Sequence, residues 1–177
     1  DVLGSRGLGD VYKRQFLYIT NIYERGNRVM KIMVINGPNI NMLGVREPDV
    51  YGNTAYSDLE NTIEEYAKNL GAEAIVLQSN GEGEIIDFIH HALGSCDAIV
   101  INPGAYTHYS YAILDALKAV NLPAVEVHIS NIHKRDDFRK KSVTASGCIG
   151  QICGLGIRGY LLAIDYLLNE MREEDDN

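Results

Sequence analysis

Positive charge is the scarcer kind in this sequence, and long hydrophobic runs are missing. The 177 residues contain 16 Lys and Arg against 24 Asp and Glu, which gives a formal net charge of -8. Nucleic-acid-binding proteins need a basic face, so this balance argues against a nucleic-acid partner. No apolar run approaches the roughly 20 residues that a bilayer-spanning helix requires, so the sequence predicts no membrane association.

Cysteine is scarce as well. Cys96, Cys148 and Cys153 are odd in number and have no C-x-x-C spacing, which is typical of reduced thiols in a cytoplasmic protein. His133 follows His128 by five positions, but no carboxylate or cysteine stands at the spacing that a zinc site would need. The sequence therefore predicts no metal site.

The first 29 residues differ in character from the rest. The stretch "DVLGSRGLGDVYKRQ" shows neither strand alternation nor a helical stripe, and its glycines fall at irregular intervals. It resembles translated adapter or vector sequence, so Met30 is the predicted start and residues 1–29 are set aside. A disordered native extension is the alternative. The whole sequence is 46% hydrophobic, enough for a sizeable core, and positions 30–177 are expected to form a single domain.

Short apolar runs alternate with amphipathic segments from Met30 onward. Strands are predicted within residues 30–36, 72–79, 97–104, 123–130 and, more weakly, 142–154, and helices within 57–71, 83–95, 111–121 and 159–172. In the first helix, Ser57 and Glu60 are expected to form a capping box and Gly71 to end the helix. This order predicts an α/β fold: a flavodoxin-like, doubly wound, five-stranded parallel sheet in a three-layer α/β/α arrangement.

Polar residues follow three of the predicted strands. In open parallel sheets ligands bind beyond the carboxyl ends of the strands, so these residues are expected to converge around one small molecule. They are Asn36 and Asn39 after the first strand, Asn102 and His108 after the third, and Glu126, His128, Ser130 and Asn131 at the end of the fourth.

The loop "NGPNINMLGVREPDVYG" contains both Arg46 and Tyr51. A free tyrosine has a pKa near 10, and lowering it by about three units takes roughly 4 kcal/mol of preferential stabilisation of the phenolate. A nearby guanidinium would supply that stabilisation, so the two residues together suggest a tyrosinate base. The alternative is an ordinary surface loop in which Tyr51 packs and Arg46 is solvated.

His128, at a strand end beside Glu126, is a candidate proton donor or acceptor. The alternative interpretation is that His128 is a structural histidine.

The motif "GLGIRG", residues 154–159, has the G-x-G-x-x-G form of a dinucleotide site. Such a site must open a βαβ crossover, whereas here only one predicted helix follows. Tight packing of that helix on the sheet is the preferred explanation.

Five ordered segments resemble the type II 3-dehydroquinate dehydratases: "INGPNINMLGVREPDVYG", "QSNGEGEIIDFIH", "NPGAYTHYSYAILDAL", "VEVHISNIHKRDDFR" and "GLGIRGYLLAIDYL". The resemblance implies a flavodoxin-like fold and a dodecamer built from trimers. It also implies conversion of 3-dehydroquinate to 3-dehydroshikimate by anti elimination of water, with neither a metal nor a Schiff-base lysine. The step would serve aromatic amino acid biosynthesis by the shikimate pathway, or quinate breakdown.

The resemblance also assigns roles to the catalytic residues. Tyr51 would be the base that removes the proton next to the ketone, held as phenolate by Arg46 with help from Arg135. Asn39 would position a water at the developing enolate. His128 would protonate the departing hydroxyl, and Glu126 would orient its imidazole.

The remaining matched residues would bind the substrate. Asn102, Ile129 and Ser130 would hold the carboxylate, and His108 and Arg139 the ring hydroxyls. Asp115 would reach the pocket from a neighbouring subunit. Gly81 and Tyr109 depart from the usual residue types beside the site, which leaves affinity and subunit packing open.

Three alternatives compete with this interpretation. A receiver-type signalling domain would place clustered acids after the first strand, where this chain has amides and Gly-Pro. A flavin carrier would place a hydroxyl-rich phosphate loop there, which is also missing. A catalytically silent homologue retained for assembly would lack some catalytic residue types, and each one is present.

Overall fold

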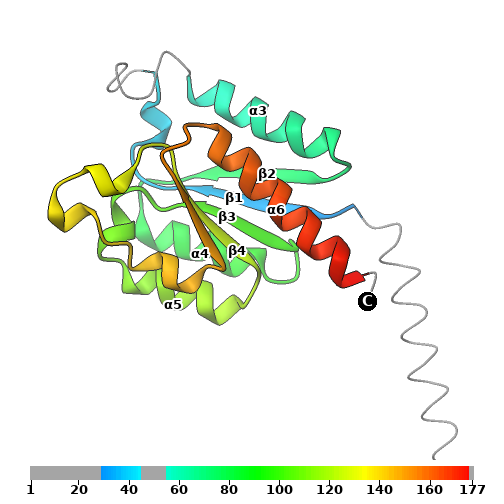
Figure 1. Ribbon diagram of the computed structural model, residues 1–177. Helices are drawn as coiled ribbons and strands as arrows, with labels where there is room; N and C mark the ends of the chain where they lie inside the picture. Colours follow the sequence, from blue (N-terminus) through cyan, green and yellow to red (C-terminus); the bar gives the residue numbers. More distant parts are fainter. Residues whose placement is uncertain (1–28, 45–54, 176–177) are drawn as a thin grey trace, which may run out of the picture.

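A five-stranded parallel sheet forms the centre of the protein, as the computed structural model shows for residues 29–44 and 55–175 (Figure 1). The strands pair in the order β2-β1-β3-β4-β5, which is the doubly wound, flavodoxin-like order predicted from the sequence. They are β1 (Lys31–Asn36), β2 (Glu73–Gln78), β3 (Ala98–Asn102), β4 (Ala124–His128) and β5 (Gly150–Cys153). The segment set aside at the N-terminus falls almost wholly outside the described residues.

Four α-helices cover the sheet, two on each face (Figure 1). They are α3 (Tyr56–Asn69), α4 (Glu82–Ala92), α5 (Tyr111–Val120) and α6 (Arg158–Asp175). Short 3-10 helices occupy the connections: η1 (Ile40–Met42), η2 (Gly104–His108), η3 (Ile132–Lys134), η4 (Asp137–Arg139) and η5 (Thr144–Gly147). Among the described residues, none of the helices has the length and apolar character needed to cross a bilayer.

Alternate residues of the strands belong to two hydrophobic cores, one on each face of the sheet. Ile32 and Val34 of β1 pack with α3 and α6, whereas Met33 and Ile35 pack with α4 and α5. Because successive side chains of a strand point to opposite faces, a strand covered on both sides must be apolar throughout. The continuous apolar runs in the sequence therefore mark strands that lie between two helical layers.

The start of α3 differs from the prediction. The helix begins at Tyr56, and the Asp58 carboxylate accepts a hydrogen bond of 3.0 Å from the backbone N–H of Ala55, so Ser57 and Glu60 do not form the expected capping box. A carboxylate in the first turn satisfies one unpaired N–H and complements the helix dipole. Gly71 does follow the helix end, in the left-handed conformation with φ 75°.

Two of the three glycines of "GLGIRG" serve close packing, as expected, whereas a Cβ at Gly156 would meet no atom within 4 Å. Gly154 has φ 82°, and a Cβ there would lie 2.9 Å from that of Asn131. A Cβ at Gly159, in the first turn of α6, would lie 3.1 Å from Val127 Cγ1. The helix thus approaches β4 closely at this point, and α6 is the last element within the described residues.

Candidate active site

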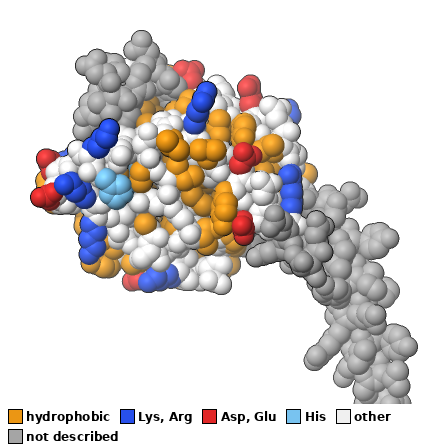
Figure 2. Space-filling model, viewed as in Figure 1, with side chains coloured by type: hydrophobic (Ala, Val, Ile, Leu, Met, Phe, Trp, Pro, Cys, Tyr) orange, Lys and Arg blue, Asp and Glu red, His pale blue; other side chains and the backbone are white. Residues whose placement is uncertain are grey.

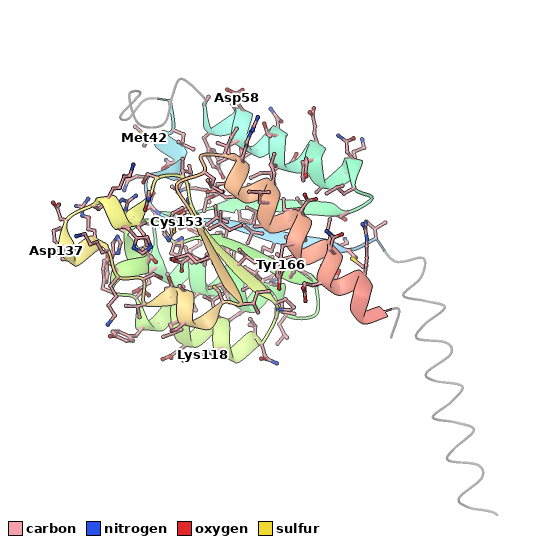
Figure 3. All side chains as sticks on the ribbon, in the orientation of Figure 1. Met42, Asp58, Lys118, Asp137, Cys153 and Tyr166 are labelled. Atoms are coloured by element: carbon pink, nitrogen blue, oxygen red, sulfur yellow. The ribbon has the colours of Figure 1, made fainter. Side chains whose placement is uncertain are left out.

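A cavity of about 780 Å³ opens beyond the carboxyl ends of the strands. Its walls come from the loop after β1, from η2 after β3, and from the segment after β4. Figure 3 labels Met42 and Asp137, which lie in the first and last of these segments. The predicted site residues that line the cavity are Asn39, Asn102, His108, His128, Ile129, Ser130, Arg135 and Arg139.

The other predicted site residues lie elsewhere. Glu126 sits behind His128 in β4 and is completely buried. Asp115 is exposed on α5 and is not among the residues lining its own protomer's cavity. Arg46 and Tyr51 lie outside the described residues, so the pairing expected between them stays a prediction.

His128 and Glu126 form a buried pair on one face of β4. His128 Nε2 donates to Glu126 Oε1 over 2.7 Å, and the two side chains are 3% and 0% exposed. A carboxylate only accepts, so this bond fixes the tautomer of the imidazole and leaves its other nitrogen for a ligand. His128 is thus tied into the structure while still forming part of the cavity wall.

Four further donors surround the Glu126 carboxylate. Oε1 accepts hydrogen bonds from Thr107 and Ser142 at 2.8 Å and from Gln151 Nε2 at 2.7 Å, and Oε2 accepts one from Thr144. Burial raises the pKa of Glu126, but the hydrogen bond and positive charge of His128 and the hydroxyls of Thr144 and Ser142 outweigh it. The net pKa lies below the usual value. Glu126 is therefore a stable carboxylate that accepts the hydrogen bond of His128 in the folded protein.

Sequence reasoning missed these four donors. Gln151 is the register partner of Glu126 on β5, so the two side chains share a face of the sheet. The fifth strand was only weakly predicted, and its register was not predicted at all. The three hydroxyls come from separate segments: Thr107 from η2, Ser142 from the loop between η4 and η5, and Thr144 from η5. No local pattern in the sequence connects them.

His108 offers the cavity a hydrogen-bond acceptor. Its Nδ1 lies 2.8 Å from the carbonyl oxygen of Lys141, which can only accept, so Nδ1 carries the proton. In the neutral ring Nε2 is then an acceptor, and it is buried without a hydrogen-bond partner in the part of the chain that the structure describes. An acceptor of this kind suits a ligand hydroxyl.

Asn39 is held at the cavity by the end of β2. It has φ 68°, a left-handed conformation that asparagine tolerates better than most residues. Its backbone N–H donates to Asn80 Oδ1 over 2.9 Å, and Gln78 Nε2 donates to the same oxygen over 3.1 Å. Asn80 and Gln78 were also missed by the sequence analysis, because their role depends on a neighbouring strand.

Basic side chains border the cavity on the segment after β4. Figure 2 shows Lys, Arg and His side chains at the left edge of the molecule, with acidic side chains beside them, and the cavity lining includes Lys134, Arg135 and Arg139 together with Asp136. Arg135 Nη2 donates to Ser130 Oγ over 2.5 Å. A chain with a net charge of -8 thus presents cationic groups where it has a cavity, which favours an anionic ligand.

Comparison with known proteins points to one family. The sequence profile of the family described as "Dehydroquinase class II" matches residues 30–168. A 3-dehydroquinate dehydratase from Clostridium acetobutylicum is 59% identical over 140 residues, which cover 79% of this chain and 97% of that protein. One from Thermotoga neapolitana is 61% identical over 138 residues, covering 78% and 94%.

A solved structure agrees with these sequences. The crystal structure of the type II dehydroquinase from Butyrivibrio crossotus is similar to this one, with a TM-score of 0.77 and 56% sequence identity. The match covers 79% of this chain and 98% of that one.

Proposed function

This chain belongs to the class II dehydroquinase family, which makes it a 3-dehydroquinate dehydratase of the shikimate pathway, and from that premise we propose how it removes water. The reaction is an anti elimination through an enolate, without a metal and without a Schiff base. One proton leaves the carbon next to the ketone, and the hydroxyl leaves the adjacent carbon with a proton from the enzyme. The product is a conjugated enone plus one water.

Tyr51 is the base in the first step. Its phenolate takes the proton next to the ketone, Arg46 stabilises the phenolate, and Arg135 assists. The charge then moves to the ketone oxygen, where preorganised donors lower the barrier most effectively. Asn39 holds a water at that oxygen, and its anchorage by Asn80 supports this role.

His128 is the acid in the second step. It gives a proton to the departing hydroxyl, and the enolate electrons form the carbon–carbon double bond as water leaves. An imidazole is suited to such transfer near neutral pH, and the ionised Glu126 beside it orients the ring through the hydrogen bond from Nε2. This buried pair, of which His128 forms part of the cavity wall, is the observation that carries the proposal.

The remaining cavity residues hold the substrate. Asn102, Ile129 and Ser130 bind the carboxylate, a role supported by the cationic groups around Ser130. His108 and Arg139 bind the ring hydroxyls, in line with the unpartnered acceptor on His108. The same step also occurs in quinate breakdown, which is the alternative route for this enzyme.

Asp115 completes the pocket of a neighbouring subunit in a dodecamer built from trimers. Its exposure on α5, away from its own cavity, supports this proposal. Substituting Asp115→Ala is expected to raise KM about tenfold, the effect of losing one charged hydrogen bond. Steady-state kinetics of the assembled variant test this, and an unchanged KM would show that the residue stays outside the site.

The proposed function is tested by following the ultraviolet absorbance of the enone as 3-dehydroquinate is consumed. Wild-type protein is expected to be active with excess chelator, and to survive borohydride added with substrate, since no imine forms. Tyr51→Phe is expected to lose at least about 10²-fold in kcat. A folded wild type without turnover would favour the silent homologue, and loss of activity on chelation would reject the metal-free mechanism.

A further inference from the structure

A buried polar chain joins the ends of β1 and β3 behind the cavity. Asn36 and Asn102 are register partners on these strands, so their side chains lie on the same face of the sheet. Tyr160 of α6, which is fully buried, reaches both. Its hydroxyl donates to Asn36 Oδ1 over 2.7 Å and accepts from Asn102 Nδ2 over 2.7 Å. The three residues are 124 and 58 positions apart in the sequence.

These contacts fix which end of the Asn102 amide is which. The backbone N–H of Gly104 donates to Asn102 Oδ1 over 3.2 Å, and a backbone N–H can only donate. The oxygen of the amide therefore faces Gly104, and the nitrogen faces Tyr160. Of the two hydrogens on Nδ2, one is used by Tyr160. Asn102 also lines the cavity, so the group it keeps for a ligand is an N–H donor.

The Tyr160 hydroxyl is suited to this fixed direction. Burial raises the pKa of Tyr160, so the hydroxyl stays protonated over the whole range in which the enzyme works. Its proton goes to Asn36 Oδ1, which leaves the oxygen as an acceptor for Asn102. If the Asn102 amide rotated by half a turn, its Nδ2 hydrogens would face the backbone N–H of Gly104, and the hydrogen bond between Gly104 and Asn102 would be lost.

Stability of the fold alone does not account for the hydrogen-bonded chain of Asn36, Tyr160 and Asn102. Among the described residues, Asn36 Nδ2 is buried and makes no hydrogen bond of normal length, although the Tyr56 hydroxyl is close enough to interact with it; a buried donor that is poorly satisfied is costly. Leucine at position 36 would avoid that cost and join the apolar core beside Ile32 and Val34. An amide kept at a cost in stability, in contact with a residue of the cavity wall, points to a role at the site.

We propose that Tyr160 is a positioning residue: it orients the Asn102 amide so that the cavity meets a hydrogen-bond donor, which selects a ligand carboxylate at that place. The identity of the ligand rests on the proposed function. Tyr160 touches no substrate itself and acts through Asn102.

The test is Tyr160→Phe, which removes one oxygen and keeps the ring. Without the hydroxyl, the Asn102 amide loses the partner that orients it. We expect KM for 3-dehydroquinate and the Kd of 3-dehydroshikimate to rise about 3–10-fold, as for one hydrogen bond. The Kd of the methyl ester of 3-dehydroshikimate, which lacks the anionic carboxylate, is expected to change less than about twofold, and kcat less than about threefold.

Tyr66→Phe is the matched control. The Tyr66 hydroxyl forms a hydrogen bond with Asp165 of α6, and Tyr66 is not among the residues that line the cavity, so its removal is expected to leave both Kd values unchanged. A Tyr160→Phe variant with a lower Tm, unchanged KM and an unchanged ratio of acid to ester affinity would overturn the proposal, because a purely structural role predicts that result. An equal loss of acid affinity in Tyr66→Phe would overturn it as well.

Asn36→Leu gives an independent test if Tyr160→Phe does not fold. It fills the same space and removes the acceptor that anchors the Tyr160 proton, so the acid affinity is expected to fall about 2–5-fold while ester affinity stays unchanged. Equal acid affinity in Asn36→Leu and wild type would reject the proposal. The Kd assays measure binding and not turnover, so they test the role of Tyr160 even if wild-type protein does not convert 3-dehydroquinate. Binding of the acid by wild-type protein without turnover of 3-dehydroquinate would contradict the proposed function and leave the role of Tyr160 intact.

Discussion

Replacing His128 with glutamine lowers kcat by about 10²–10⁴-fold, the usual contribution of a general acid, while the protein stays folded. The amide nitrogen of glutamine can still donate to Glu126, so the buried carboxylate keeps its partner. What is lost is a group that gives up a proton near neutral pH. The loss is expected in kcat more than in KM, because the proton is transferred only as the hydroxyl departs.

Turnover of 3-dehydroquinate as a function of pH is the measurement for His128→Gln. His133→Gln is the control, since His133 is an exposed residue of η3 outside the cavity lining, and it should behave as wild type. If His128→Gln keeps kcat within about threefold of wild type, His128 is not the general acid. The structural interpretation of this histidine would then be correct.

Replacing Glu126 with glutamine is expected to lower the free energy of unfolding by about 3–5 kcal/mol, the usual effect of breaking a buried ionic pair. The carboxylate accepts hydrogen bonds from His128, Gln151 and three hydroxyls. In glutamine one of the two oxygens becomes an NH2 group, which is itself a donor and cannot accept the hydrogen bonds of these groups. Urea unfolding measures the effect. Glu73→Gln is the control: Glu73 pairs with Lys31 at the surface over 3.0 Å, where a salt bridge contributes at most about 1 kcal/mol.

The Glu126→Gln effect should depend on pH. Since the folded-state pKa of Glu126 lies below its usual value of 4.5, its ionisation stabilises the fold above about pH 4.5. That contribution is lost as the pH falls through the lower, folded-state pKa. The difference between wild type and variant should therefore be constant near neutrality and shrink in acid. A difference that grows in acid would mean that Glu126 is protonated in the native state.

Local patterns in the sequence were enough to predict the sheet and the edge where the site lies. Strands such as 97–104 carry continuous apolar runs because helices cover both faces, and the helices between them carry a 3.6-residue stripe. Parallel strands bring their carboxyl ends to one edge, so Asn39, Asn102 and His128 were expected to meet there, and all three line the cavity. The capping residue of α3 was predicted wrongly because several polar residues near a helix start compete for the same N–H groups.

The support of the site required the tertiary structure. Gln151 meets Glu126 only because β5 pairs with β4 in one register, and a shift of one residue would turn it to the opposite face. Tyr160 joins Asn36 and Asn102 only because α6 packs over β3 and β4, where its Tyr160 side chain reaches the end of β1. By itself, the sequence determined the order of elements and the reactive residues at strand ends, because both follow from short-range periodicity. Which donors surround each reactive group was decided by strand register and helix packing, since these contacts join residues far apart in the chain.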